Sequence, residues 1–416
     1  MENKMLLIGR RAKQAAPELM ALSTGEKNRI LSEIAKALVS RQEDILKANE
    51  LDLKNAEENG ISKVMADRLR LTSQRIEDIA KAIGTVIDLE DPVGIVEEGY
   101  TRPNGLSILK KRVPMGVVGI IFESRPNVTV DAAVLCIKSG NAAVLRGGKE
   151  AIHTNRMLAE IMREAVASCG VSRDIVILVE DTSRESSLAM MKLNGYLDVL
   201  IPRGGAGLIR AVVENATVPV IETGVGNCHV YVDETADLKM AVEIVNNAKV
   251  SRPSVCNACE SLLVSRKVAE EFLPAVKKRL DEHQVEWHGC EETCKILGKE
   301  VIPATEEDYA REYLDYKLSV KVVSNVEEAV RHINAYNTGH SECIVTNSLK
   351  NAEYFTARVD AAAVYVNAST RFTDGGEFGL GAEIGISTQK LHARGPMGLK
   401  ELTTTKYIIG GNGQIR

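Results

Sequence analysis

The sequence lacks several features that would assign it to a special class of protein. No stretch offers about 18 uninterrupted apolar residues, and the first residues show neither a long apolar core nor a small-residue cleavage site. The 416 residues carry a net charge of only −5, and no block of lysine and arginine is long enough to attract nucleic acid or an anionic membrane. These absences predict a cytoplasmic protein with no nucleic-acid partner and no membrane partner, and they favour chemistry on a small molecule.

The chain lacks a regular cysteine pattern: its eight cysteines are an unremarkable number for 416 residues, and they are irregularly spaced. Such spacing argues against a disulfide framework, and we expect thiols in a reducing compartment. The spacing of Cys256 and Cys259 permits a redox dithiol, but the flanking pattern is not the strand-to-helix context of such motifs. Because His288, Cys290 and Cys294 lack a fourth ligand at suitable spacing, we predict no metal site.

The first quarter of the chain contains helices and one hairpin. Residues 3–90 show the spacing of successive amphipathic helices with solvated polar faces. Residues 94–114 form a predicted β-hairpin with its turn at 102–105. A hairpin of this size is marginal alone, so we expect it to pair with another element or another subunit.

From residue 117 onward, apolar strands alternate with helices. The first such series runs over 117–222, with its last strand expected at 218–222, and a second series begins near residue 237. Periodicity is weak over 284–316, which is left unassigned. Repeated strand–helix units predict an α/β fold with parallel sheets, a usual location for a dinucleotide. No helix of the first series opens with G-x-G-x-x-G, which counts against the standard dinucleotide fingerprint.

Cys256 lies in a short polar loop between a helix-like run and a strand-like run. Pro253 and Ser254 discourage regular structure before it, and residues 260–264 follow as a predicted buried strand. A cysteine displayed at such a boundary suits acyl chemistry, because a thiolate is a strong nucleophile and its thioester is easily reduced or hydrolysed. The alternative is that Cys256 is a small buried hydrophobe. No histidine lies near it in sequence, so the fold itself must stabilise a thiolate.

Three motifs, at 122–127 (FESRPN), 252–258 (RPSVCNA) and 367–387 (NASTRFTDGGEFGLGAEIGIS), resemble those of the aldehyde dehydrogenase superfamily. More narrowly, they resemble its branch that reduces glutamate 5-phosphate, and the similarity spans essentially the whole chain. The resemblance implies an aldehyde-dehydrogenase-like fold of two parallel α/β domains and an oligomerisation arm. Its parts are a Rossmann-like NADP-binding domain at 1–97 and 115–232, a catalytic domain at 233–370, a β-arm at 98–114 and 400–416, and a glycine-rich substrate segment at 371–399.

The resemblance also implies roles for two catalytic residues. Cys256 matches the nucleophile of the superfamily, and Asn127 matches the asparagine whose amide, with the Cys256 N–H, stabilises the oxyanion. Such a donor acts mainly where charge develops in the transition state, and one donor is worth about 3 kcal/mol. In the alternative interpretation, Asn127 caps a helix that begins near Val128.

For the cofactor, the resemblance places Arg146, Gly147 and Lys149 at the adenosine ribose. A glutamate at the Lys149 position would bind the 2′-hydroxyl of NAD, whereas lysine beside arginine attracts a 2′-phosphate, so we predict NADP(H). Gly204 and Gly205 form a turn whose N–H groups can approach the diphosphate. Glu312 lies near the position that holds the nicotinamide ribose. The alternative is that the charged residues of this set are simply solvated.

The implied reaction is the NADPH-dependent reduction of L-glutamate 5-phosphate to L-glutamate 5-semialdehyde through a cysteine thioester, the second step of proline biosynthesis. Arg125, Arg252 and Arg371 are the cations expected to bind the phosphate and the α-carboxylate. The implied partners are further copies of the chain, as a homodimer or larger homo-oligomer, and a transient contact with glutamate 5-kinase. Two rivals stay open: an aldehyde-oxidising enzyme that uses Glu222 to activate water, and a non-catalytic assembly protein.

Overall fold

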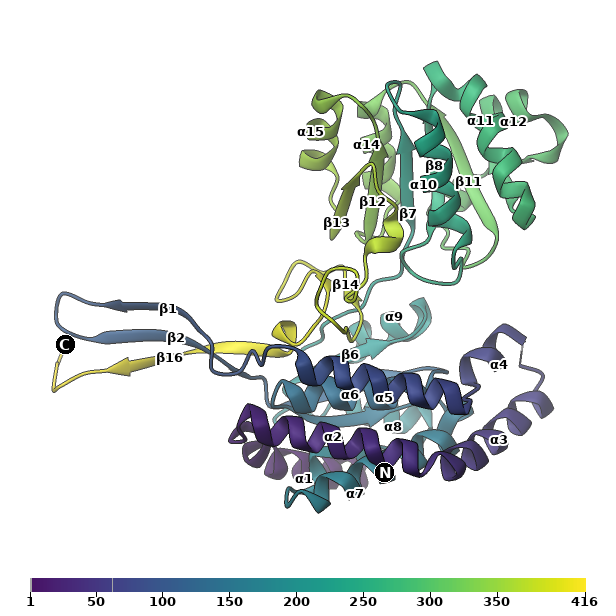
Figure 1. The fold of residues 1–416 in the computed structure, drawn as a ribbon. Helices are drawn as coiled ribbons and strands as arrows, with labels where there is room; N and C mark the ends of the chain where they lie inside the picture. The colour runs from purple at the N-terminus through teal and green to yellow at the C-terminus, as the bar shows by residue number, and fades with distance from the viewer. Residues whose placement is uncertain (1, 62) are drawn as a thin grey trace. The chain divides into compact units, whose positions relative to one another are not determined.

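The computed structural model describes residues 2–61 and 63–416, which divide into two compact units (Figure 1). The first unit contains Met1–Glu222, Gly379–Gly385 and Met397–Arg416, and the second contains Thr223–Phe378 and Ile386–Pro396. The chain therefore crosses between the units more than once, and the glycine-rich segment contributes to both. Within the described ranges, no helix is both long and apolar enough to cross a membrane.

A parallel four-stranded sheet forms the centre of the first unit. Its order is β5-β4-β3-β6, and its members are β3 (Val117–Phe122), β4 (Ala142–Arg146), β5 (Val176–Leu178) and β6 (Val199–Arg203). Every residue of β3 is buried, because helices cover a parallel sheet on both faces. The predicted α/β arrangement is confirmed for this part of the chain.

Helices surround this sheet in layers (Figure 1). One face carries α1 (Glu2–Met20), α8 (Arg184–Met191) and α9 (Ala206–Asn215), whose apolar residues share a core with the strands. Against β4 and β5 pack α6 (Pro126–Lys138) and α7 (Ile152–Ser168). The remaining helices of the unit are α2 (Thr24–Ser40), α3 (Gln42–Glu58), α4 (Lys63–Leu69) and α5 (Ser73–Asp88). The amphipathic helices expected at the start of the chain are thus present.

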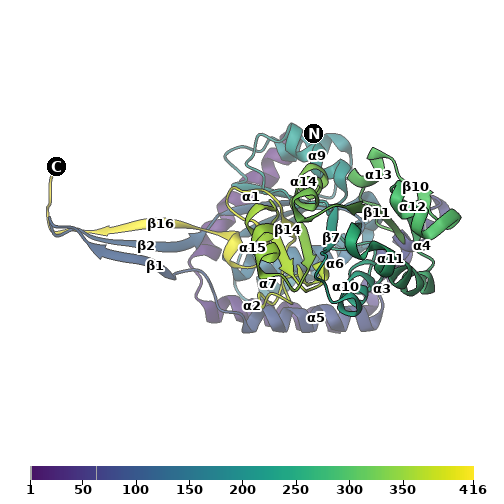
Figure 2. The same cartoon turned by 90° about the horizontal axis from the view of Figure 1, so that it is seen from above.

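The predicted hairpin is present, and the C-terminal strand expected to belong to the same arm pairs with it. The antiparallel pair β1 (Val96–Thr101) and β2 (Ser107–Pro114) is joined by β16 (Thr403–Gly410), as both views show (Figures 1 and 2). All six residues of β1 are exposed, and the sheet displays several large apolar side chains to solvent: Tyr100, Leu109, Tyr407, Ile408 and Ile409. We refer to these three strands as the β-arm.

The second unit is built on a seven-stranded, all-parallel sheet in the order β10-β9-β11-β8-β7-β12-β13. Its strands are β7 (Cys228–Val232), β8 (Cys259–Ser265), β9 (Glu286–Gly289), β10 (Ile302–Pro303), β11 (Lys317–Val323), β12 (Ser341–Val345) and β13 (Ala363–Val366). One apolar core joins the sheet to α10 (Leu238–Val250) and α11 (Arg266–Leu280). Another joins it to α14 (Val326–Tyr336) and α15 (Leu349–Arg358). Both faces of the sheet are therefore covered.

Three details differ from the sequence predictions. Residues 218–222 form only an isolated bridge, between Leu200 and Val220, so the strand predicted there is wrong. The predicted first domain, 115–232, includes β7, but this strand pairs inside the second sheet, because periodicity identifies a strand without identifying its sheet. The unassigned region 284–316 holds short elements, among them α12 (Glu291–Leu297) and α13 (Glu306–Ala310), which are too brief to show a period.

Two histidines are buried in the second unit. His229 and His332 are 0% and 5% exposed, and their rings meet edge to face at 5.8 Å. Burial lowers the pKa of each to about 3. In the unfolded chain a histidine has a pKa of about 6.5. Between that pH and about 3, each histidine is therefore protonated in the unfolded state but neutral in the folded state. Each histidine therefore lowers the free energy of unfolding as the pH falls from 6.5 toward 3.

The contribution of His332 can be measured by comparing how the free energy of unfolding depends on pH in His332→Phe and in the wild type, because all other titrating groups are shared. On moving from pH 7.5 to 5.0, we expect the variant to gain about 2 kcal/mol of stability relative to the wild type. Urea unfolding followed by the fluorescence of Trp287, the single tryptophan, reports on the second unit, because this side chain is buried in its core. A relative stability that does not change with pH would mean that His332 is protonated in the fold.

Candidate active site

The loop at 251–258 joins the end of α10 to the start of β8, and it presents a half-buried Cys256. Its neighbour Asn257 is buried and anchors the loop to the segment that follows β13. The Asn257 side-chain amide donates to the carbonyls of Arg371 (3.2 Å) and Thr373 (3.0 Å), and the Asn257 carbonyl accepts from the Thr370 hydroxyl (2.7 Å). The predicted strand after the loop is present as β8, so Cys256 does lie at an element boundary.

The backbone of Cys256 is packed against β7 and the residues that precede it. A Cβ placed on Gly226 would lie 1.4 Å from the Cys256 carbonyl oxygen and 2.8 Å from its Cα, so no side chain fits there. The Cys228 thiol donates to the same carbonyl at 3.2 Å. These contacts fix the main chain at Cys256.

Two of the predicted substrate arginines gather around this loop. The Arg371 guanidinium donates to the Ser251 hydroxyl at 3.1 Å and to the Asn257 side-chain oxygen. Burial lowers the pKa of Arg371, the nearby charge of Arg252 lowers it further, and Asp374 and Cys256 oppose both effects. Arg371 therefore contacts the loop that carries both Arg252 and Cys256. Arg125 lies in the first unit, at the N-cap of α6.

Cys228 and Cys259 differ from Cys256 in being fully buried. Cys259 is fully buried, its thiol donates to the Ser261 carbonyl at 3.4 Å, and burial raises its pKa to about 12. Burial also raises the pKa of Cys228. All eight cysteines lie in described ranges and are thiols, so Cys256 and Cys259 are not joined. His288, from the group considered as metal ligands, contacts Glu286 (2.8 Å) and Asp308 (3.1 Å).

Asn127 lies in the first turn of α6, which begins at Pro126 with Arg125 as its N-cap. The interpretation of Asn127 as the helix cap is wrong, because the helix starts one residue before it. Its amide donates to the Asp131 carboxylate at 2.8 Å, and burial raises the pKa of Asp131 to about 6. An amide nitrogen carries two N–H bonds, so this contact leaves a second one for an oxyanion. Asn127 belongs to the first unit and Cys256 to the second.

The predicted ribose-binding residues lie at the end of β4 and directly after it. The Arg146 guanidinium donates to the carbonyls of Thr182 (2.6 Å) and Ser183 (3.1 Å), and burial lowers its pKa. Lys149 is exposed, whereas the adjacent Glu150 accepts hydrogen bonds from the Ser124 N–H (2.8 Å) and hydroxyl (2.6 Å). The Glu150 carboxylate is therefore hydrogen-bonded within the protein, whereas the Lys149 side chain is exposed to solvent.

Gly147 is enclosed in the same region, where a Cβ would lie 2.2 Å from the Asn155 amide nitrogen. Gly204 and Gly205 form the turn that leads into α9. The Gly205 N–H donates to a carboxylate oxygen of Glu123 at 2.8 Å, so this amide already binds an anionic group. The Gly205 N–H thus binds an anionic oxygen, as it would have to do to bind a diphosphate. Binding of a diphosphate at this turn stays a prediction.

Two glutamates named from the resemblance lie at different places. Glu312 is half-buried in the second unit, and its carboxylate accepts from the Gly226 N–H at 2.7 Å. Burial raises the pKa of Glu312. Glu222 is half-buried at the end of a segment of the first unit. Glu312 thus contacts the residue that supports Cys256, a relation that no sequence pattern indicated.

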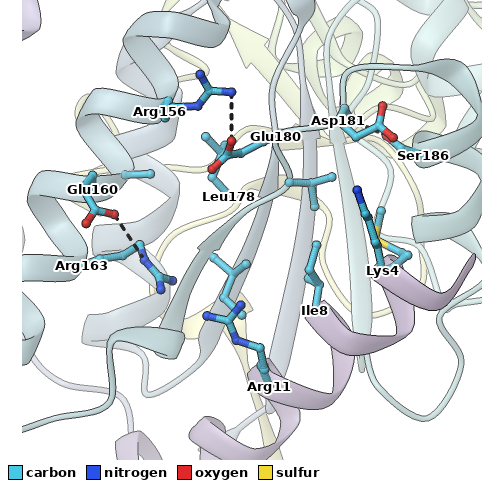
Figure 3. Close-up of a pocket in the computed structure, with 14 residues that line it drawn as sticks. Lys4, Ile8, Arg11, Arg156, Glu160, Arg163, Leu178, Glu180, Asp181 and Ser186 are labelled. Carbon is cyan, nitrogen blue, oxygen red and sulfur yellow. Dashed lines mark hydrogen bonds and ion pairs between the residues drawn. The ribbon is translucent and has the colours of Figure 1, made fainter. Parts of the chain in front are cut away.

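A separate hollow of about 400 Å³ lies in the first unit (Figure 3). Residues from α1, α7, β5 and the start of α8 line it, and none of them belongs to the predicted sites. Its charged groups are largely paired, with Arg156 to Glu180 at 2.9 Å and Arg163 to Glu160 at 3.9 Å (Figure 3). We therefore assign it no part in the chemistry.

Sequence reasoning missed Gly226, Asn257 and the buried pair Lys249–Glu260, which the structure places around the Cys256 loop. Asn257 and Glu260 lie close to Cys256 in sequence, so their position was a usable signal. Gly226 is 30 residues away in the chain, and a single glycine carries no pattern that identifies its neighbour.

Comparisons with known proteins cover the full chain. The profile of the aldehyde dehydrogenase family matches residues 5–296 and 318–408. A γ-glutamyl phosphate reductase of Clostridium perfringens (strain 13 / Type A) is 60% identical over 416 residues, which is 100% of both chains. One of Caldicellulosiruptor bescii is 58% identical over 417 residues, again 100% of both chains. The crystal structure of γ-glutamyl phosphate reductase from Thermotoga maritima matches with a TM-score of 0.97 and 51% identity, covering 99% of each chain.

Proposed function

The chain belongs to the aldehyde dehydrogenase family of oxidoreductases, and from that premise we propose that it reduces L-glutamate 5-phosphate to L-glutamate 5-semialdehyde with NADPH. The observation that carries this proposal is the gathering of Cys256, Arg252 and Arg371 around one loop. An acyl phosphate with an α-carboxylate has two anionic groups, and guanidinium groups suit both. The full-length similarity to γ-glutamyl phosphate reductases gives the substrate its name.

In the proposed reaction, the Cys256 thiolate attacks the acyl carbon of the substrate. A sulfur–carbon bond forms, the carbon–oxygen bond to phosphate breaks, and phosphate leaves with the electron pair. Because phosphate is a weakly basic leaving group, no strong general acid is needed beside Cys256. A dinucleotide held by the residues named below would supply the hydride that reduces the thioester. Cys256 would then leave the carbon as its thiolate when the aldehyde is released. We assign Asn127 the oxyanion role on its match to the family motif.

Lys149 and Arg146 support NADP(H) as the dinucleotide. Lys149 is exposed and Glu150 is engaged with Ser124, so the positive charge is the one available to a 2′-phosphate. The amide of Gly205 and the glycine before it would face the diphosphate, in place of Glu123. Glu312 is the residue of the second unit that we propose for the nicotinamide ribose.

Lys149→Glu is expected to weaken NADPH binding by about 10- to 100-fold while changing NADH binding little, because one charge-assisted contact to phosphate is lost. The measurement is the Kd of each dinucleotide by fluorescence titration. Lys47→Glu makes the same charge change at an exposed position on α3 and should leave both Kd values unaltered. Equal weakening of NADPH and NADH would place the 2′-phosphate elsewhere.

The reverse reaction separates this function from its closest rival. With semialdehyde and NADP, a phosphorylating enzyme reduces NADP only when inorganic phosphate is present, since phosphate must release the acyl group from Cys256. An aldehyde-oxidising enzyme would use water activated by Glu222 and would need no phosphate. We expect phosphate-dependent turnover that survives in Glu222→Gln. Turnover without phosphate that is lost in Glu222→Gln would overturn the proposal.

The β-arm supports association with further copies of the chain. Its exposed apolar residues, including Tyr407 and Ile409, would be covered by a partner. We propose a homodimer or larger assembly, and a monomer in sedimentation velocity at micromolar concentration would contradict it. A contact with glutamate 5-kinase, which makes the unstable acyl phosphate, is the partner proposal that follows from the substrate.

A further inference from the structure

A buried ion pair closes the base of the Cys256 loop. Lys249 lies in the last turn of α10 and Glu260 is the second residue of β8, so the pair spans the loop from one side to the other. The ammonium lies 2.6 Å from one carboxylate oxygen of Glu260, and both side chains are fully buried. A buried ion pair is often no more stabilising than apolar residues of equal size, so its presence calls for a role other than stability.

The second carboxylate oxygen of Glu260 holds a strained residue. It accepts a hydrogen bond from the Leu314 N–H at 3.1 Å. Leu314 has a φ of +55°, in the left-handed region that a leucine adopts only when its surroundings enforce it. The hydrogen bond from Leu314 to Glu260 is one such constraint, and it fixes the direction of the residues next to Leu314.

Glu312, two residues before Leu314, continues the chain of contacts toward the nucleophile. Its carboxylate accepts from the Gly226 N–H at 2.7 Å. Gly226 in turn packs its backbone directly on the carbonyl of Cys256, where a Cβ would lie 1.4 Å from the oxygen. Three successive contacts therefore connect Glu260 to the main chain of Cys256.

We propose that Glu260 is a positioning residue for Cys256: by holding Leu314, it sets Glu312 on Gly226. It thereby fixes Cys256 within the loop that carries Arg252 and contacts Arg371. The inference rests on the proposed function only in taking Cys256 as the nucleophile. In this proposal, the buried Lys249–Glu260 pair serves to maintain the position of Cys256. Lys249 holds one carboxylate oxygen of Glu260, and the other oxygen holds the N–H of Leu314. The position of Leu314 then determines the position of Glu312.

Two double variants separate this role from a purely structural one. Lys249→Met with Glu260→Met removes both buried charges and the acceptor for Leu314, whereas Lys249→Met with Glu260→Gln removes the charges but keeps an amide oxygen as the acceptor. The measurement is the rate of Cys256 alkylation by iodoacetamide at pH 7 in the whole chain without dinucleotide, followed by peptide mass spectrometry. Cys294, half-exposed in the same unit, is the internal reference for reagent access. Labelling of buried Cys259 would report a loosened fold.

We expect the Met–Met variant to react at least 10-fold more slowly at Cys256, because the thiol leaves the field of the two guanidinium groups, while the Met–Gln variant stays within 3-fold of the wild type. Under the proposed function, kcat should follow the same order with KM little changed. Equal rates in the two variants, or a faster Met–Met variant, overturn the proposal. Should either variant label Cys259, the alkylation rates of Glu312→Ala and Glu312→Gln without dinucleotide make the same comparison one contact closer to Cys256. Only the alkylation rates decide there, because Glu312 is also the proposed ligand of the nicotinamide ribose. Because alkylation needs no substrate, absence of NADPH oxidation would count against the proposed function and leave this result standing.

Discussion

Cys256→Ala is expected to lower kcat/KM for glutamate 5-phosphate by at least about 10⁴-fold, because removing the nucleophile of a covalent mechanism leaves only binding and oxyanion stabilisation. The NADPH oxidation rate with freshly generated acyl phosphate measures it. The fold should be retained, since Cys256 is half-buried and the loop is held through its main chain and through Asn257.

The matched control is Cys294→Ala. This thiol is also half-buried in the second unit, at α12, where it packs against the apolar core and donates weakly to the Gly289 carbonyl at 3.4 Å. Its loss should leave kcat/KM within a factor of about two, because Cys294 belongs to α12 and not to the 251–258 loop that carries the proposed nucleophile. Undiminished turnover in Cys256→Ala would remove the covalent mechanism, and an equal loss in both variants would point to instability.

Gly226→Ala is expected to lower kcat by about 10²-fold or more, although Gly226 bears no functional group. A methyl group at this position overlaps the backbone of Cys256, where no flexible side chain can move aside. The glycine has no positive φ among the described backbone angles, so the contact and not the conformation excludes a side chain. Overpacking should also lower the free energy of unfolding by about 1–3 kcal/mol.

Gly84→Ala serves as the control for this substitution. Gly84 lies inside α5, with nothing within 4 Å of the position that a Cβ would take. Alanine there should leave kcat unchanged and stabilise the helix by about 0.5–1 kcal/mol. Thermal unfolding and steady-state rates of the two variants are compared side by side. A Gly226→Ala protein that keeps its kcat would show that the Cys256 loop can shift without loss.

Much of this architecture can be predicted from the sequence, because the strands that follow residue 117 are apolar runs bounded by turns. The same pattern predicted the boundary before β8, where Pro253 and Ser254 interrupt the chain, and that boundary is where Cys256 lies. What the pattern could not give is the sheet to which a strand belongs. The strand β7 follows directly on the first series, yet its hydrogen bonds are to β8 and β12 in the second sheet.

Of the candidate site, the sequence could indicate the residues whose type carries the chemistry, such as Cys256 and Arg371. Supporting contacts were out of reach, because they join residues that are distant in the chain and common in type. Glu312 is an example of both cases. Its resemblance to a ribose ligand could be recognised in the sequence, but its hydrogen bond to Gly226, 86 residues away, could be found only in the structure. Gly226 itself matters because its lack of a side chain leaves room for the Cys256 carbonyl.

The thioester mechanism is tested most directly by looking for the acylated cysteine. The wild-type chain is mixed with glutamate 5-semialdehyde and NADP without phosphate, quenched in acid within milliseconds to seconds, and its peptides are analysed by mass spectrometry. Without phosphate the acyl group cannot be released as the acyl phosphate, so we predict a glutamyl thioester on the peptide that contains Cys256, which disappears when phosphate is added. A chain that reduces NADP under these conditions with no acyl group on Cys256 at any time would contradict the mechanism.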